Sequence, residues 1–102
     1  MKTNVIAALI VALIGGIGTA AAGDAGAGKA KFAVCAGCHG PTGAGNEALK
    51  YPKLTGRDAA FVAEQLRAFK SGARDNATMK AMTAGLSEAD MDNLAAYIAT
   101  LK

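Results

Sequence analysis

The sequence predicts a single all-α domain. Val and Ile, which favour strands, occur only three times after residue 22, whereas Ala, Leu, Lys, Glu and Met are frequent. Apolar residues also recur at helical spacing in the middle and at the end of the chain. With 102 residues, the chain is long enough for one small domain and too short for a multidomain enzyme.

The predicted domain has few bulky apolar side chains. Of the 80 residues from 23 to 102, 19 are Ala and only 19 are larger apolar residues. A core of that size rarely stabilises a chain of ~80 residues or fewer without disulfides, a metal or a cofactor. We therefore expect a bound group to fill part of the interior.

Residues 1–22 have the layout of a secretory signal peptide. Lys2 precedes an apolar run over residues 5–17, and three alanines end at Ala22. The run falls short of the ~20 residues that a spanning helix needs. We expect cleavage after Ala22, which leaves residues 23–102 exported and without a stable membrane span. An uncleaved membrane anchor is the alternative.

The first predicted helix covers residues 25–36. Gly28 and Phe32 lie four residues apart on one face, and a small residue beside an aromatic one indicates a close helix crossing. From Gly40 to Gly56, Gly and Pro are too frequent for long regular structure. A layer of loops is therefore expected after the first helix.

The second predicted helix runs from Asp58 to Ser71. Apolar residues recur there at helical spacing, and Gly72 is placed to end the helix. Residues 72–86 are expected to be irregular, because they contain two Gly together with Asp, Asn and Thr.

The last predicted helix has the clearest start signal. Ser87 is placed to cap it, and Asp90 stands three residues later, where a capping box places its acid. The apolar stripe of this helix consists of Met91, Leu94, Ile98 and Leu101.

Cys35, Cys38 and His39 are the only Cys and His residues of the chain, and they form the C-x-x-C-H pattern of c-type haem attachment. Thiols three residues apart project from the same side of a helical turn, so both can form thioether bonds with the vinyl groups of one haem. His39 follows four residues after Cys35, so its imidazole can reach the iron. The pattern predicts one covalently attached haem c, which also supplies the missing core.

Three alternatives explain the same residues less completely. A structural zinc site needs four ligands, and the chain offers three. A thioredoxin-like redox pair is expected after a strand, whereas a helical segment precedes Cys35. A disulfide between Cys35 and Cys38 closes a very small loop and leaves His39 without a role.

The second axial ligand of the iron is restricted by the single His. It is Met, Lys, an exogenous molecule or nothing, and Met is the usual choice in electron-transfer cytochromes. Met91 belongs to the apolar stripe of the last helix, so core packing is its expected role. Met79 and Met82 lie in the segment that can cross the far face of the haem.

Over residues 24–101 the chain resembles class I cytochromes c, in particular the small bacterial monohaem forms and single halves of the dihaem forms. Besides C-x-x-C-H, the shared residues include Gly40-Pro41, Tyr51-Pro52-Lys53-Leu54-Thr55-Gly56, Gln65-Leu66 and Leu86-Ser87. The resemblance implies the class I cytochrome c fold, in which three to four short helices and loops surround the haem.

The resemblance also implies roles for particular residues. In the family the axial Met lies seven residues before the Leu of the Leu-Ser pair, which favours Met79 over Met82. The carbonyl of Pro52 is expected to accept a hydrogen bond from His39 and so fix its orientation, with a plain turn proline as the alternative.

Further contacts are implied for the helices and for two arginines. The first helix is expected to cross the last through Gly28, Phe32, Leu94 and Tyr97. Arg57 and Arg74 either reach the haem propionates or are solvated at the surface.

These observations predict a periplasmic one-electron carrier and not an enzyme. Its expected partners are redox proteins, a respiratory or dehydrogenase donor and a terminal oxidase or reductase acceptor, that dock at the exposed haem edge of a monomer. The rivals are a cytochrome subunit of a larger dehydrogenase, and a haem enzyme or gas sensor with an open iron position.

Charge supports binding to proteins and not to nucleic acid. The net charge is only +3, and no basic tract with interleaved aromatic residues occurs. Cations outnumber acids over residues 23–86, whereas acids outnumber cations over residues 87–102. This asymmetry predicts electrostatic steering of docking partners.

Overall fold

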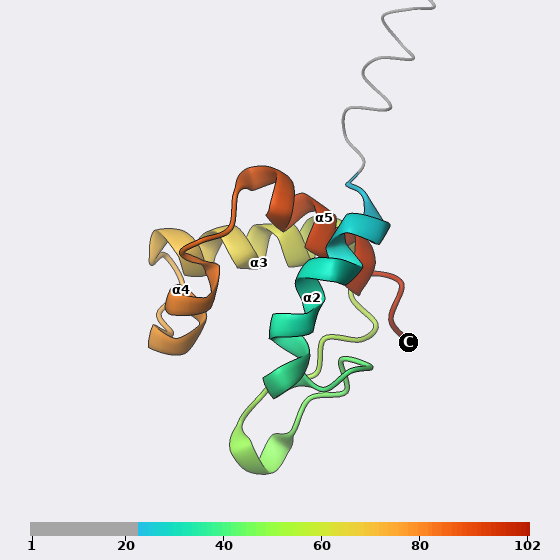
Figure 1. Cartoon of the computed structure of the whole chain (residues 1–102). Coiled ribbons are helices and arrows are strands. Elements are labelled where there is room, and N and C mark those ends of the chain that lie inside the picture. The colour runs from blue at the N-terminus through green and yellow to red at the C-terminus, as the bar shows by residue number, and fades with distance from the viewer. Residues whose placement is uncertain (1–22) are drawn as a thin grey trace, which may run out of the picture.

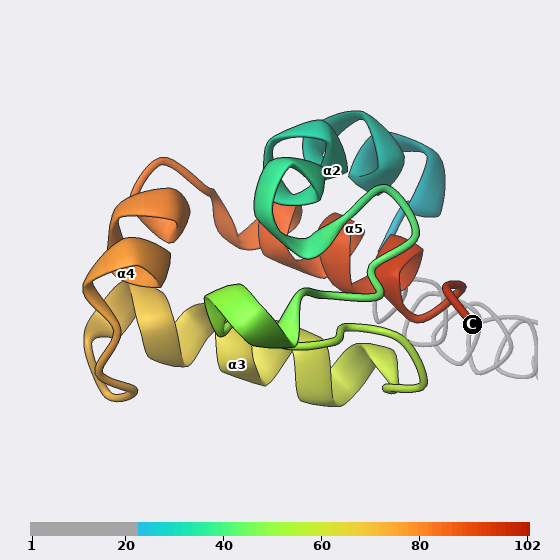
Figure 2. The same ribbon diagram turned by 90° about the horizontal axis from the view of Figure 1, so that it is seen from below.

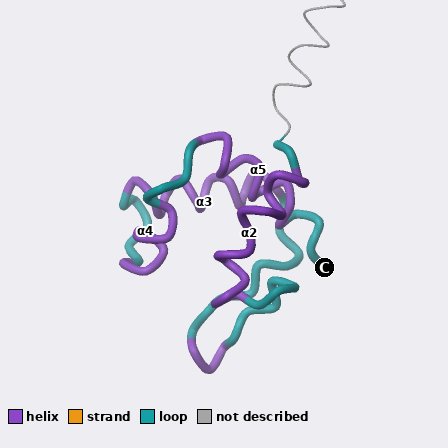
Figure 3. Tube along the Cα trace, in the orientation of Figure 1, coloured by secondary structure: helices purple, strands orange, loops and turns teal. Residues whose placement is uncertain are grey.

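The computed structural model describes residues 23–102, which form helices and loops without a strand (Figure 1). The helices are α2 (Ala25–His39), α3 (Ala59–Ser71), α4 (Ala77–Thr83) and α5 (Glu88–Ile98), and a 3-10 turn, η1, covers Glu47–Leu49. The long loop layer before α3 stands out when the trace is coloured by secondary structure (Figure 3). The predicted all-α class is confirmed, whereas the predicted signal peptide over residues 1–22 lies outside the described residues.

Helix α2 is longer than predicted. The sequence places its end at Ala36, but the helix continues to His39, and Gly40 ends it with a φ of 86°. Gly37 does not interrupt the helix, because a Gly inside a helix costs only ~1 kcal/mol relative to Ala. The whole C-x-x-C-H pattern therefore lies on the last turns of one helix.

Helix α5 packs between α2 and α3, and α2 crosses it closely (Figure 2). A Cβ atom added at Gly28 would lie 1.9 Å from the carbonyl oxygen of Asn93, so only Gly permits this approach. Next to the crossing point, the rings of Phe32 and Tyr97 lie 5.2 Å apart between centroids. The predicted crossing of the first and last helices is confirmed, with Asn93 and Tyr97 as the nearest neighbours of Gly28.

Helix α3 closely matches its predicted range. The side chain of Asp58 caps it by accepting a hydrogen bond from the N–H of Phe61, and Gly72 ends it in the left-handed conformation. The buried face of the helix consists of Val62, Ala63, Leu66 and Phe69.

The prediction of an irregular segment over residues 72–86 is wrong in its middle, which forms α4. The side chain of Asn76 accepts a hydrogen bond from the N–H of Met79 at 2.9 Å and so caps the helix. Asn is a turn former in general but one of the best residues at the N-cap position. The hydroxyl of Thr83, at the other end of α4, is buried and donates to the carbonyl of Met79 at 2.8 Å.

Helix α5 begins as predicted. Ser87 and Asp90 form a reciprocal capping box, with both hydrogen bonds at 3.0 Å. The helix ends at Ile98, so Leu101 lies beyond it and is half-buried. The core lies where α2, α3 and α5 meet, and its members include Phe32, Leu66, Met91, Leu94, Ala95 and Ile98.

Candidate functional site

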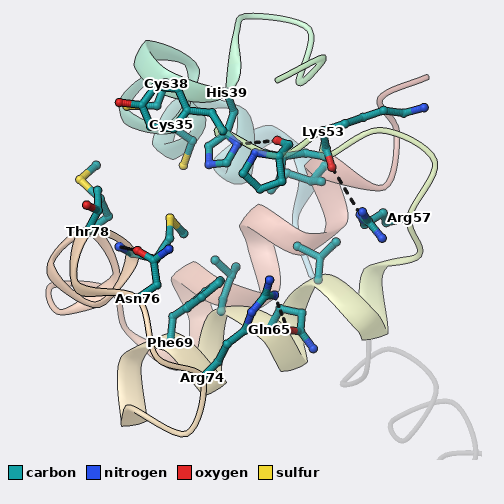
Figure 4. Close-up of a pocket in the computed structure, with 18 of the residues that line it drawn as sticks. Cys35, Cys38, His39, Lys53, Arg57, Gln65, Phe69, Arg74, Asn76 and Thr78 are labelled. Carbon is teal, nitrogen blue, oxygen red and sulfur yellow. Dashed lines mark hydrogen bonds between the residues drawn. The ribbon is translucent and has the colours of Figure 1, made fainter. Parts of the chain in front are cut away.

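A cavity of about 510 Å³ opens beside the core. Its wall is built from the end of α2, the loop over residues 49–54, the face of α3 and the start of α4 (Figure 4). This volume is within the ~300–1,000 Å³ that small-molecule sites occupy. Most of the wall is apolar, and the predicted site residues that line it are Cys35, Cys38, His39, Pro52, Met79 and Met82.

The two cysteines of α2 are free thiols at the cavity wall. Cys35 is half-buried and Cys38 is exposed. Burial raises the pKa of the Cys35 thiol, and the neighbouring Cys38 adds to the shift, while a backbone hydrogen bond opposes it. This shift favours the neutral thiol of Cys35 over the thiolate.

His39 is buried at the end of α2, with 6% of its surface exposed. Its Nδ1 lies 2.9 Å from the carbonyl oxygen of Pro52. A carbonyl oxygen only accepts, so this hydrogen bond requires the proton to be on Nδ1 and leaves a lone pair on Nε2. The ring lies at the cavity wall, so Nε2 is available as a ligand from that side.

The methionines differ in position and in exposure. Met79 lies in the first turn of α4 and is partly buried against the core, whereas Met82 is 40% exposed. Both side chains line the cavity. Met91 does not, and its 2% exposure confirms the predicted role in core packing.

Two arginines also line the cavity. The guanidinium of Arg74 lies 4.5 Å from the ring centroid of Phe69, and its Nη1 donates to the side-chain oxygen of Gln65 at 2.6 Å. Arg57 is held more loosely, with its Nε 3.5 Å from the carbonyl oxygen of Lys53. Gln65 and Phe69 were not predicted as site residues, although their spacing of four on α3 places them on one helix face.

The residues fit a covalently attached haem and not a bare metal ion. Within the described residues, no group of three or more His, Cys, Asp or Glu side chains converges in a way that could hold a metal ion. A thiol pair on one helix, an imidazole with a free Nε2 and two thioethers instead surround an apolar space. These are the donors and the walls that a haem c requires.

Comparison with known proteins decides the family. The family model described as Cytochrome c matches residues 25–102. The chain belongs to the cytochrome c family. As a cytochrome c domain it carries covalently attached haem c with iron, and C-x-x-C-H is the pattern that attaches it.

Relatives and solved structures agree with this assignment. Cytochrome c-554(547) from Halothiobacillus neapolitanus is 47% identical over 95 residues, covering 79% of this chain and 100% of the relative. The thiosulfate dehydrogenase electron acceptor from Thiomonas intermedia is 43% identical over 94 residues, covering 92% of this chain and 43% of the relative. Reduced cytochrome c4 from Pseudomonas stutzeri superposes with a TM-score of 0.73 at 34% identity, covering 79% of this chain and 52% of that structure. The class I cytochrome c fold is thereby confirmed.

The chain spans less than half the length of several relatives, including the Thiomonas protein and cytochrome c4 from Pseudomonas aeruginosa. The cytochrome domain is therefore shared, while these relatives contain further sequence. Among residues 23–102, no helix combines the length and the apolar character needed to cross a membrane.

Proposed function

We propose that this protein is an exported carrier of single electrons whose redox group is one haem c. Cys35 and Cys38 attach the haem through thioether bonds, and His39 and Met79 are the axial ligands of its iron. The observation that carries the proposal is the common cavity, which is lined by His39 of α2 and by Met79 of α4.

The surroundings of His39 support its role as proximal ligand. The carbonyl of Pro52 fixes the proton on Nδ1, so the imidazole meets the iron in one tautomer and one orientation. A fixed orientation matters because an electron carrier works best when its ligand set does not rearrange between oxidation states. Pro52 acts through its backbone carbonyl and contacts the ligand, not the iron.

The surroundings of Met79 favour it over Met82 as the second ligand of the iron. The N–H of Met79 is held by the Asn76 side chain, and its carbonyl accepts from the buried hydroxyl of Thr83. Met82 lies in the same helix, but it is 40% exposed and is not among the side chains packed against the core. A side chain that is already packed loses less conformational entropy when it binds the metal.

The chain supports transfer of an electron without chemical change of a substrate. When bound, the haem iron supplies a one-electron couple, and Met ligation raises its potential. Val62, Leu66 and Phe69 of α3 form an apolar wall that keeps water from the ring. With His39 and Met79 both as ligands, the iron would have no open position for peroxide or a gas, as a carrier requires.

Export and the leader are part of the proposal. The pattern of residues 1–22 supports cleavage after Ala22 and a periplasmic location for the cytochrome c domain over residues 23–102.

A thiosulfate dehydrogenase is a candidate for the electron donor of this protein. The thiosulfate dehydrogenase electron acceptors of Thiomonas intermedia and Stutzerimonas stutzeri are 43% and 44% identical over the matched residues. A thiosulfate dehydrogenase structure from Marichromatium purpuratum also contains a segment with a TM-score of 0.63 to this chain. We propose such a dehydrogenase as the electron donor, which the protein meets either as a free carrier or as a bound subunit.

The test uses protein matured in a bacterial periplasm. We expect a reversible one-electron redox titration, with no rapid change of the reduced spectrum when carbon monoxide is added. Rapid binding of carbon monoxide by the parent protein would show an open iron position and favour the enzyme or sensor. Purification with a dehydrogenase at constant ratio would show a subunit, whereas separation on a sizing column would show a free carrier.

A further inference from the structure

We propose that the amino group of Gly23, which cleavage after Ala22 would create, binds as an ammonium ion at a second site between α3 and α5. The inference rests on the proposed function, because it requires the leader to be removed at that bond. The site is separate from the haem cavity, since none of its lining residues lines that cavity. It is lined by Gly23, five alanines and the charged side chains of Glu64, Arg67 and Asp92.

The backbone of α5 fixes the position of Gly23. A Cβ atom added to this residue would lie 2.2 Å from the carbonyl oxygen of Asp92, so the contact excludes any side chain at position 23. The N–H of the next residue, Asp24, donates to the side-chain oxygen of Asn93 at 2.8 Å, and the Asp24 carboxylate caps α2. Figure 1 shows this start of the described chain beside α5. Terminal residues are usually poorly ordered unless such contacts hold them.

The side chains around Gly23 carry an excess of negative charge. Arg67 is the one cation among the lining residues, and its guanidinium is shared between Glu88 at 2.8 Å and Asp92 at 2.6 Å. Among residues 23–102, no ion pair is found for Glu64. Three carboxylates and one guanidinium therefore leave two negative charges in excess. A positive group at this position is attracted to them.

Cleavage after Ala22 would supply that positive group. The new amino group is bonded directly to the Cα atom of Gly23, which α5 already holds at the site. In the uncleaved chain the same nitrogen belongs to a neutral amide. The ion pair is therefore available only to the processed protein, so removal of the leader adds to the stability of the folded domain.

The ammonium should stabilise the fold at neutral pH and lose its effect in alkali. An α-amino group in an unfolded chain has a pKa of about 8. Neighbouring carboxylates favour its charged form and so raise this pKa in the folded state. A raised pKa means that the stabilisation is fully present below about pH 8 and is lost as the pH rises through the raised value. The charged groups that face the amino group are Glu64 and Arg67 of α3, Asp92 of α5 and the adjoining Asp24.

The experiment removes the charge from the amino group of the holo-protein. Transamination converts an N-terminal glycine amine to a neutral carbonyl and leaves the lysine side chains unchanged. Mass spectrometry first establishes that the mature chain begins at Gly23. We then expect the treated protein to melt roughly 2–5 °C below the untreated one at pH 7. The difference should shrink as the pH is raised above 9, and the absorption spectrum of the haem should stay the same.

Two variants show whether the site itself is responsible. E64Q removes a carboxylate that lines the site, so transamination should lower its melting temperature by less than in the parent. E47Q is the matched control, because Glu47 is an exposed acid in η1 and does not line the site. Transamination should lower the melting temperature of E47Q as much as that of the parent.

Equal melting of the treated and untreated parent would overturn the inference. So would an effect of transamination that is as large in E64Q as in the parent, because the charge would then act elsewhere. A mature chain that begins at another residue would contradict the proposed cleavage and the inference together. A colourless protein would instead contradict the proposed electron carrier, which the melting temperatures do not test.

Discussion

At the scale of single residues, the fold depends on a few positions that tolerate one residue type. Gly28 is one of them, because the backbone of α5 passes where any side chain at this position would lie. His39 is another, because its two ring nitrogens have different partners, the carbonyl of Pro52 on one side and the cavity on the other.

Substitution of Gly28 by Ala is expected to destabilise the protein. The added methyl group would overlap the Asn93 carbonyl, so α2 and α5 must move apart. Such overpacking costs ~1–3 kcal/mol, and each kcal/mol lowers the melting temperature by roughly 4–8 °C in a domain of this size. Thermal unfolding followed by circular dichroism measures the change.

Gly37→Ala is the matched control for Gly28→Ala. Gly37 lies in the same helix, and a Cβ atom there would meet nothing within 4 Å. Ala favours a helix over Gly by ~0.5–1 kcal/mol, so this variant should melt at or above the temperature of the parent. Equal melting temperatures for the two variants would contradict the close crossing.

At the scale of elements, helix caps position the site. Asn76 begins α4 one residue before the turn that contains Met79, and Ser87 with Asp90 begins α5, which carries much of the core. Both caps involve side chains that accept from backbone N–H groups three residues later. Loss of a cap therefore loosens the residues of the first turn more than the rest of the helix.

Asn76→Ala is expected to weaken the bond between Met79 and the iron. Loss of an Asn cap costs ~1 kcal/mol, which corresponds to about fivefold in an equilibrium constant. Titration of the oxidised protein with imidazole should show displacement of the axial ligand at a concentration about fivefold lower than in the parent. Asn46→Ala, which removes the cap of η1 on the other side of the site, should leave this concentration unchanged. Equal effects of both variants would count against α4 as the element that holds the ligand.

The capping box of α5 should make stability depend on pH. The N–H of Ser87 donates to the Asp90 carboxylate and lowers its pKa, while burial opposes this shift and the charge of Lys31 adds to it. A lowered pKa in the folded state means that the carboxylate stabilises the fold above its usual pKa and stops doing so as the pH falls through the lowered value. Asp90→Ala should therefore melt below the parent at neutral pH, and the difference should shrink in acid. A difference independent of pH would contradict this account.

The sequence predicted some helices better than others. The start of α5 was predictable because both residues of its capping box are visible in the sequence, and α3 was predictable from its apolar spacing and from Gly72.

Helix α4 was not predicted, because Asn76 is a common turn former and acts as a cap only when the residues after it are helical. The end of α2 was misplaced because Gly37 and Gly40 look alike in sequence, and only the φ of Gly40 marks the stop. Gln65 and Phe69 share one face of α3, but the sequence does not show that this face borders the cavity, because that depends on packing between elements.

At the scale of the whole molecule, the cavity and the charge distribution define two different sides. The cavity wall carries four cations and no acid, whereas three acids of α5 lie near Arg67 and Lys31. The haem fills the space that the small apolar side chains leave, so core and cofactor site are one continuous region.

This charge distribution should steer acidic redox partners toward the cavity side. Electrostatic steering raises association rates at low salt and is screened over about 10 Å at 0.1 M ionic strength. Stopped-flow electron transfer with an acidic redox protein should therefore slow as salt increases, and Lys53→Gln should reduce this dependence. Rates that do not change with ionic strength would contradict steering.

We propose that one haem is held between His39 and Met79, and the absorption spectrum of the oxidised protein tests this ligand pair most directly. The weak sulfur-to-iron band should be present in the parent and in Met82→Ala, and absent in Met79→Ala, while all three proteins retain covalently bound haem. A band lost in Met82→Ala but kept in Met79→Ala would contradict the ligand assignment. A folded parent protein without haem colour, matured in a periplasm, would contradict the account as a whole.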